Sequence, residues 1–222
     1  MFVVSTRKEL SVMISATRFA VILAMSLIPA LGRAQDFSAD VVYLPRSGSA
    51  ALPSSTDGSG HNPSKLYVSN GKMRLETHGL IGTILLVNRD GDSAYAVFPA
   101  RKEYEPLAAG LSEYFPVKDV ENACPDWQKA AGQQISCEKV GYEVIGGRQT
   151  VKYKNKNASD FATSAVWIDS VLKFVVKWEG ASTSAELRNL QEGQQEANLF
   201  TLPSGFSTVQ PRKSGNKKGF SK

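Results

Sequence analysis

The sequence is poor in the residues from which catalytic and metal sites are built. Among 222 residues there are two cysteines and two histidines, His61 and His78. A zinc site needs three or four ligands, and a serine or cysteine hydrolase needs a nucleophile beside an imidazole and an acid. Neither histidine stands next to a nucleophile motif, and no glycine spacing typical of a phosphate loop is present. We therefore expect no enzyme, no metal and no cofactor.

Long hydrophobic runs are also missing, apart from one short run near the N-terminus. The run covers 19–31 (FAVILAMSLIPAL), follows Arg18, and precedes the small residues around Ala34. A basic start, a short apolar centre and a small-residue cleavage site are typical of a secretory signal, whereas a membrane anchor would need about 20 apolar residues. We expect cleavage near Ala34/Gln35 and a periplasmic or secreted protein. Met13 is an alternative start to Met1.

The excess of positive charge is confined to the ends of the chain. The formal net charge is +5, but 1–34 contributes four basic residues against one acid. The last residues, 211–222 (PRKSGNKKGFSK), contribute five basic residues and no acid. The expected organisation is a signal peptide at 1–34, a domain at 35–210 and a disordered basic tail at 211–222. The slightly acidic domain argues against nucleic acid, and an anionic membrane surface is the alternative contact for the tail.

The two cysteines, Cys124 and Cys137, lie in a segment rich in Pro, Gly, Gln and Ala. In an exported protein an isolated pair at this spacing predicts one disulfide that closes a surface loop. A redox pair would more often have the Cys-x-x-Cys spacing, which is absent. A structural disulfide is therefore the favoured interpretation.

After the predicted cleavage site the chain alternates short apolar strands with turn signals. Asn70-Gly71 is suited to a two-residue hairpin, and Gly146-Gly147 predicts a second one. One internal run, 106–115, has helical spacing that places Leu107, Leu111, Tyr114 and Phe115 on one face. Strands are expected at 37–43, 65–69, 72–77, 81–88, 93–99, 138–145, 150–153, 164–169, 172–179 and 184–190.

This pattern predicts an α+β but mostly β fold, with a single strongly curled antiparallel sheet and one to three short helices. A sheet of this size has a broad apolar face that one short helix cannot cover. Either a second sheet closes over that face, or the face forms the wall of a cavity.

The C-terminal part of the chain carries a resemblance to a known family. A strand ending in Leu-x-Asn-Leu, a short turn and a closing Leu-Phe-x-Leu-Pro-x-Gly-Phe motif lie within 187–209. Together with FSADVVY, LYVSNGKMRLE, the cysteine-bearing segment and VWIDSVLKFVVKW, it resembles the periplasmic lipoprotein-carrier-like (LolA-like) superfamily, in particular an uncharacterised secreted bacterial branch. The resemblance implies a half-open β-barrel around a hydrophobic cavity. The classical carriers open with a helix, whereas Phe37 lies three residues after the predicted cut.

The functional expectation is a non-enzymatic envelope protein that holds a lipid, an acyl chain or another apolar ligand, with lipid or lipoprotein carriage as its role. The alternative is an interaction or sensor module that binds an envelope protein through its concave sheet. A monomer is expected in either case. The side chains expected to line the cavity are Leu85, Val87, Leu111, Phe115, Trp167, Phe174 and Trp178.

Overall fold

The computed structural model describes residues 35–45, 63–78, 82–89, 93–108, 113–132, 135–157, 163–181 and 183–209. The predicted signal peptide and basic tail lie outside these ranges, as do His61 and Leu111. Within them, no helix is long and apolar enough to cross a membrane.

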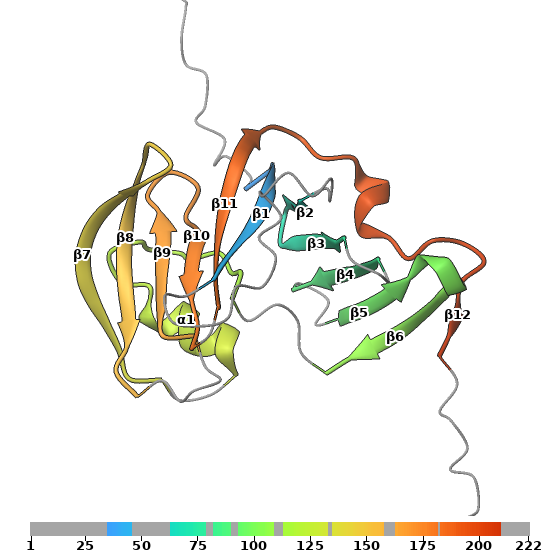
Figure 1. The fold of residues 1–222 in the computed structure, drawn as a ribbon, viewed down its shortest axis with the longest axis horizontal. Coiled ribbons are helices and arrows are strands. Elements are labelled where there is room, and N and C mark those ends of the chain that lie inside the picture. The colour runs from blue at the N-terminus through green and yellow to red at the C-terminus, as the bar shows by residue number, and fades with distance from the viewer. Residues whose placement is uncertain are drawn as a thin grey trace, which may run out of the picture. The chain divides into compact units, whose positions relative to one another are not determined.

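The described strands form one sheet in the order β12-β6-β5-β4-β3-β2-β1-β11-β10-β9-β8-β7 (Figure 1). Every neighbouring pair is antiparallel except β12 and β6, and the curled sheet does not close into a barrel. The predicted fold class is therefore confirmed. The strands are β1 (Phe37–Pro45), β2 (Ser64–Ser69), β3 (Lys72–Thr77), β4 (Thr83–Asn88), β5 (Ser93–Phe98), β6 (Glu103–Leu107), β7 (Cys137–Ile145), β8 (Arg148–Asn155), β9 (Ala165–Asp169), β10 (Phe174–Glu179), β11 (Thr183–Glu192) and β12 (Ser207–Thr208).

Both predicted hairpins are present, because their turn residues can adopt positive φ. Asn70 and Gly71 have φ of 47° and 75° between β2 and β3. Gly146 and Gly147 have φ of 57° and 79° between β7 and β8. Two-residue turns of this kind match the twist of antiparallel strands, so they fix the register of each pair.

The helix expected at 106–115 was wrong where the structure describes it. Pro106 and Leu107 belong to β6, and residues 113 and 114 form a bend. The α-helix instead lies at Cys124–Ala131 (α1), in the segment interpreted as a disulfide-closed loop. Proline near the first helical position, Asp126 in the first turn and Gly132 at a left-handed C-cap are ordinary helix start and stop signals. Two short 3₁₀ helices, η1 (Pro99–Arg101) and η2 (Ala197–Phe200), complete the fold.

The strand register gives the sheet two distinct faces. We call the face that carries Phe37, Val68 and Met73 the inner face, and the opposite one the outer face. Buried apolar residues form two clusters. The sheet cluster contains Phe37, Ala39, Val41, Leu66, Val68, Met73, Leu75, Val87, Ala94, Tyr114, Leu172, Phe174, Val176, Ala185 and Leu187. The helix cluster contains Phe115, Val117, Ala123, Trp127, Ile135, Val151, Tyr153, Val166, Ile168 and Val175.

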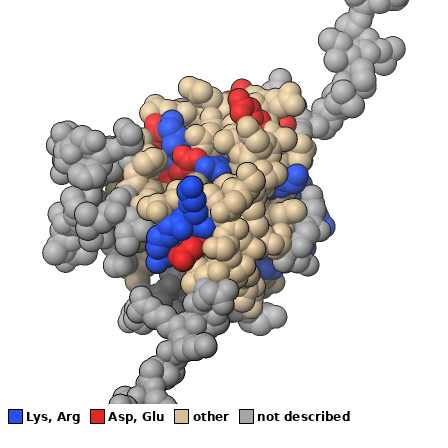
Figure 2. Space-filling view, turned by 90° about the vertical axis from the view of Figure 1, so that its right-hand side faces the viewer, with Lys and Arg blue, Asp and Glu red and all other residues tan. Residues whose placement is uncertain are grey.

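The C-terminal segment contacts the outer face at β3 and pairs with the edge of β6. Arg74 Nη1 on β3 donates to the Leu199 carbonyl oxygen in η2 at 3.0 Å. Beyond η2, the Val209 N–H donates to the Tyr104 carbonyl oxygen at 2.8 Å, which extends the pairing of β12 with β6. The side of the molecule that carries these elements has Lys and Arg side chains next to Asp and Glu among mostly uncharged residues (Figure 2). Next to this segment, Arg101 of η1 and Glu103 of β6 form an ion pair with Nε and Oε2 3.1 Å apart.

Candidate functional site: the apolar inner face

The inner face of β1 to β5 is built from aligned apolar side chains. Because opposite residues of an antiparallel pair point to the same face, the register places whole rows of side chains together. One row runs through Phe37, Val68, Met73, Val87, Ala94 and Leu107, and the next through Ala39, Leu66, Leu75, Leu85 and Ala96. Glu105 ends the second row on β6, where it is exposed. The face is therefore apolar in its middle and charged only at its margin.

The same face continues across β11 to β8. Ala185 on β11 is opposite Trp178 on β10, Trp178 is opposite Val166 on β9, and Val166 is opposite Tyr153 on β8. Trp178 is half-buried and packs against both clusters. The two clusters are thus neighbouring parts of one inner face, and Trp178 stands at their junction.

Helix α1 and the segment before it cover the β8–β10 end of this face. Trp127 of α1 is buried in the helix cluster with Phe115. The Tyr153 hydroxyl donates to the Val120 carbonyl oxygen at 2.8 Å and accepts from the Ala123 N–H at 3.3 Å. The Cys124–Cys137 disulfide ties the first residue of α1 to the first residue of β7, which confirms the predicted pair.

The structure distributes the side chains predicted to line a cavity over several surroundings. Leu85, Val87 and Phe174 belong to the sheet cluster or pack against it, and Trp178 joins the two clusters. Phe115 lies in the helix cluster, and Leu111 is outside the described residues. Of these candidates, Leu85, Val87 and Trp178 share the inner face by strand register.

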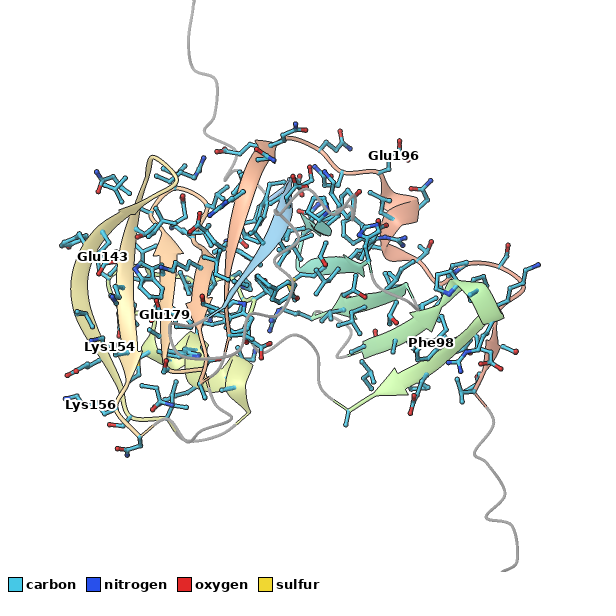
Figure 3. All side chains as sticks on the ribbon, viewed as in Figure 1. Phe98, Glu143, Lys154, Lys156, Glu179 and Glu196 are labelled. Atoms are coloured by element: carbon cyan, nitrogen blue, oxygen red, sulfur yellow. A yellow bond between two sulfur atoms is a disulfide. The ribbon has the colours of Figure 1, made fainter. Side chains whose placement is uncertain are left out.

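Trp167 lies on the outer face, whereas its neighbour Ile168 is in the helix cluster. The Trp167 indole N–H donates to Glu143 Oε2 at 2.6 Å. Lys152 Nζ and Lys177 Nζ each lie 4.3 Å from the centroid of the Trp167 ring, so two cations share one aromatic side chain. Glu143 lies on β7 (Figure 3). Its Oε1 lies 2.9 Å from Lys152 Nζ, and the hydrogen bonds from Lys152 and Trp167 lower the pKa of the Glu143 carboxyl. The Trp167 indole N–H therefore has its hydrogen-bond acceptor within the protein.

Two buried polar atoms at the junction of the clusters are not satisfied in this way. Tyr114 is 2% exposed, and its hydroxyl has no hydrogen-bond partner among the described residues. The same holds for the indole nitrogen of Trp178. Burial raises the pKa of the Tyr114 hydroxyl, the nearby Tyr43 and Glu113 act in the same direction, and the adjacent Trp178 opposes the rise. The Tyr114 hydroxyl therefore stays protonated at neutral pH and acts as a donor.

Tyr114 was not singled out from the sequence as a site residue, although it was placed on the apolar side of the expected helix. A buried tyrosine next to Phe115 looks like ordinary core packing, because the sequence does not reveal whether its hydroxyl finds an acceptor. Among the described residues, no group of three or more His, Cys, Asp or Glu side chains is placed to hold a metal ion.

Comparison with known proteins gives matches to solved structures only. No family model matches the chain, and no curated protein matches it. An uncharacterised conserved protein from Thermus thermophilus is 9% identical, with a TM-score of 0.45, over 78% of this chain and 89% of the other. A MucA/MucB complex from Pseudomonas aeruginosa gives 10% identity and a TM-score of 0.43, over 79% of this chain and 58% of the other.

A putative outer membrane lipoprotein-sorting protein domain from Vibrio parahaemolyticus is 14% identical, with a TM-score of 0.26, over 75% of this chain and 89% of the other. The chain spans less than two thirds of the matched chain in the MucA/MucB complex. At these identities and TM-scores, the matches do not assign the chain to a family.

Proposed function

We propose that the protein is a non-enzymatic binding protein of the cell envelope that holds an apolar ligand, such as a lipid or an acyl chain, against the inner face of β1 to β5. The observation that carries this proposal is the composition of the sheet cluster. Of its described buried members, only Tyr114 and Leu172 come from outside the strands, whereas α1 packs in the helix cluster. Placement in the envelope rests on the secretory character of 1–34.

The chemistry of the face favours a hydrocarbon over a polar ligand. Side chains of Leu, Val, Met, Phe and Ala fill its two central rows, and burial of apolar surface contributes about 25 cal/mol per Å². A sugar or nucleotide would lose its hydration there without gaining hydrogen bonds. An alkyl chain loses nothing comparable, so it is the ligand class that the face can bind.

Native mass spectrometry of the full chain, purified without detergent from its bacterial host, tests the proposal. We expect mass additions that correspond to copurified lipid and disappear after delipidation with organic solvent. The delipidated protein should then bind a fluorescent apolar dye that added fatty acyl lipid displaces. A protein that is empty after purification and binds neither dye nor lipid would contradict the proposal.

A matched pair of variants on β4 locates the ligand. Leu85 and Ile84 are adjacent and both half-buried, but they point to the inner and outer face respectively. We expect Leu85→Lys to lower the affinity for the dye at least about tenfold, because a charged group enters the apolar rows. Ile84→Lys should change the affinity less than about twofold. Equal loss in both variants, at unchanged melting temperatures, would place the ligand elsewhere.

A second candidate function, binding of a protein partner, is favoured by strand β7. It is the last strand of the sheet among the described residues, and its Val140, Tyr142 and Val144 side chains are 48%, 63% and 58% exposed. An exposed edge strand with apolar side chains is a template for an added strand. Crosslinking in the host should then recover a reproducible partner with the wild type and fail to recover it with Val144→Asp. Val171→Asp, a change of a valine in the β9–β10 turn that is 66% exposed, should retain it.

A further inference from the structure

The junction between the two clusters contains a pair of donors without an acceptor. The Tyr114 hydroxyl and the Trp178 indole N–H are both buried and lie next to each other, and neither has an acceptor of good hydrogen-bond geometry among the described residues. Where the Trp178 indole N–H donates to the Tyr114 hydroxyl oxygen, the hydroxyl proton still lacks an acceptor, because an indole nitrogen only donates. A buried donor without a partner costs free energy, so such groups in a native protein call for an explanation.

We propose that Tyr114 and Trp178 form the polar end of the inner-face site and donate hydrogen bonds to a neutral carbonyl oxygen, which identifies the ligand as an acyl ester. This inference rests on the proposed function, since the ester's alkyl chain would lie along the apolar rows of β1 to β5. Trp178 lies opposite Ala185, and Ala185 is also opposite Tyr43 on β1. The donors therefore stand at the end of the same apolar face and not on a separate surface.

The charges near the donors distinguish an ester from a free fatty acid. Glu113 contributes negative charge at both Tyr114 and Tyr43 and helps to raise the pKa of each hydroxyl. Among the described residues, Arg89 is a cation that contacts Tyr114, and its Nη2 donates to the Tyr114 backbone carbonyl oxygen at 2.6 Å and not to the hydroxyl. A carboxylate placed at the hydroxyl would lie in an apolar site near another negative charge, which is costly. An ester carbonyl accepts the same hydrogen bonds without carrying a charge.

Two tyrosines of the same chain provide a matched comparison of stability. Tyr114 and Tyr153 are 2% and 1% exposed, but of the two only the Tyr153 hydroxyl donates to an acceptor among the described residues, the Val120 carbonyl oxygen, and it also accepts from the Ala123 N–H. In the delipidated protein, Tyr153→Phe should lower the melting temperature by about 2 to 4 °C. Tyr114→Phe should leave it unchanged or raise it, because the change removes a donor that has no acceptor.

The decisive experiment measures binding of methyl decanoate, decanoate and undecane to the full chain by displacement of an apolar dye. The wild type should bind methyl decanoate about tenfold more tightly than undecane and than decanoate. Tyr114→Phe should reduce this preference over undecane to about twofold without changing the affinity for undecane. Tyr153→Phe should keep the preference. The Trp178 indole N–H resonance should shift with methyl decanoate and not with undecane.

The outcomes separate the two proposals. If undecane binds but the ester is not preferred, or if Tyr114→Phe keeps the preference, the donor pair does not bind the ligand and only the proposed function stands. Decanoate binding as tightly as methyl decanoate would overturn the assignment of a neutral acceptor. Failure of all three probes to bind would overturn the proposed function, and the ester with it.

Discussion

Replacing Asp169 with alanine is expected to lower the free energy of unfolding by about 3 to 4 kcal/mol, the largest effect that we expect from a single substitution. Asp169 is 1% exposed at the end of β9. Its Oδ1 accepts the N–H groups of Val171 and Leu172, both at 2.8 Å. Its Oδ2 forms an ion pair with Arg148 Nε on the neighbouring strand β8. Removing the carboxylate leaves three donors without their acceptor.

The size of this effect follows from the position of the β9–β10 turn, which begins after Asp169. The Asp169 carbonyl oxygen also accepts the Lys173 N–H at 2.9 Å, and Lys173 has a positive φ of 52°. The Lys173 carbonyl in turn accepts the Val117 N–H at 2.8 Å, so the turn holds the segment that carries Phe115 onto β10. Loss of Asp169 should therefore loosen the helix cluster as well as the hairpin.

Urea unfolding of Asp169→Ala and Asp126→Ala compares two aspartates that accept backbone hydrogen bonds. Asp126 accepts one, from the Lys118 N–H at 2.8 Å, on the surface. Its replacement should cost about 1 kcal/mol. The loss of unfolding free energy in Asp169→Asn should lie between those of the two alanine variants. The amide oxygen can still accept the N–H groups of the turn, but the charge that pairs with Arg148 is lost. If Asp169→Ala and Asp126→Ala lowered the free energy of unfolding equally, burial of the hydrogen bonds and ion pair of Asp169 would contribute nothing to stability.

The sequence predicts much of the sheet because its local signals agree with one another. Asn70-Gly71 between two alternating strands dictates a hairpin, and the structure contains it with the predicted register. Strand β6 was missed, because Pro106 near its end and the apolar spacing after it imitate a helix. Helix α1 was missed for the opposite reason. Its composition suggests a loop, and only Pro125 and Gly132 mark its ends.

The site was less predictable than the fold. Alternation of side chains places Leu85 and Val87 on one face, and the register agrees. Alternation also requires Trp167 and Ile168 to point to opposite faces, but it does not tell which of them faces inward. That depends on which face α1 covers, a long-range contact with no local signal. The unsatisfied Tyr114 hydroxyl is likewise visible only when the surrounding atoms are known.

Replacing both Cys124 and Cys137 with serine is expected to lower the free energy of unfolding by about 3 kcal/mol. The disulfide spans 13 positions, and its removal increases the conformational freedom of the unfolded chain. In the folded protein it holds the start of α1 against β7, the edge strand, which on its free side has no neighbouring strand among the described residues. The same bond therefore stabilises the cover of the helix cluster.

Urea unfolding of the oxidised wild type, the reduced wild type and the double variant tests this expectation. The reduced wild type should match the variant, because both lack the crosslink, and both should show a larger dependence of the free energy on urea as their unfolded chains expose more surface. Free thiols in the oxidised, denatured protein would rule out the bond. If the double variant lost only a few tenths of a kcal/mol of unfolding free energy, packing of Trp127 and hydrogen bonding of Tyr153 would be enough to hold α1 in place.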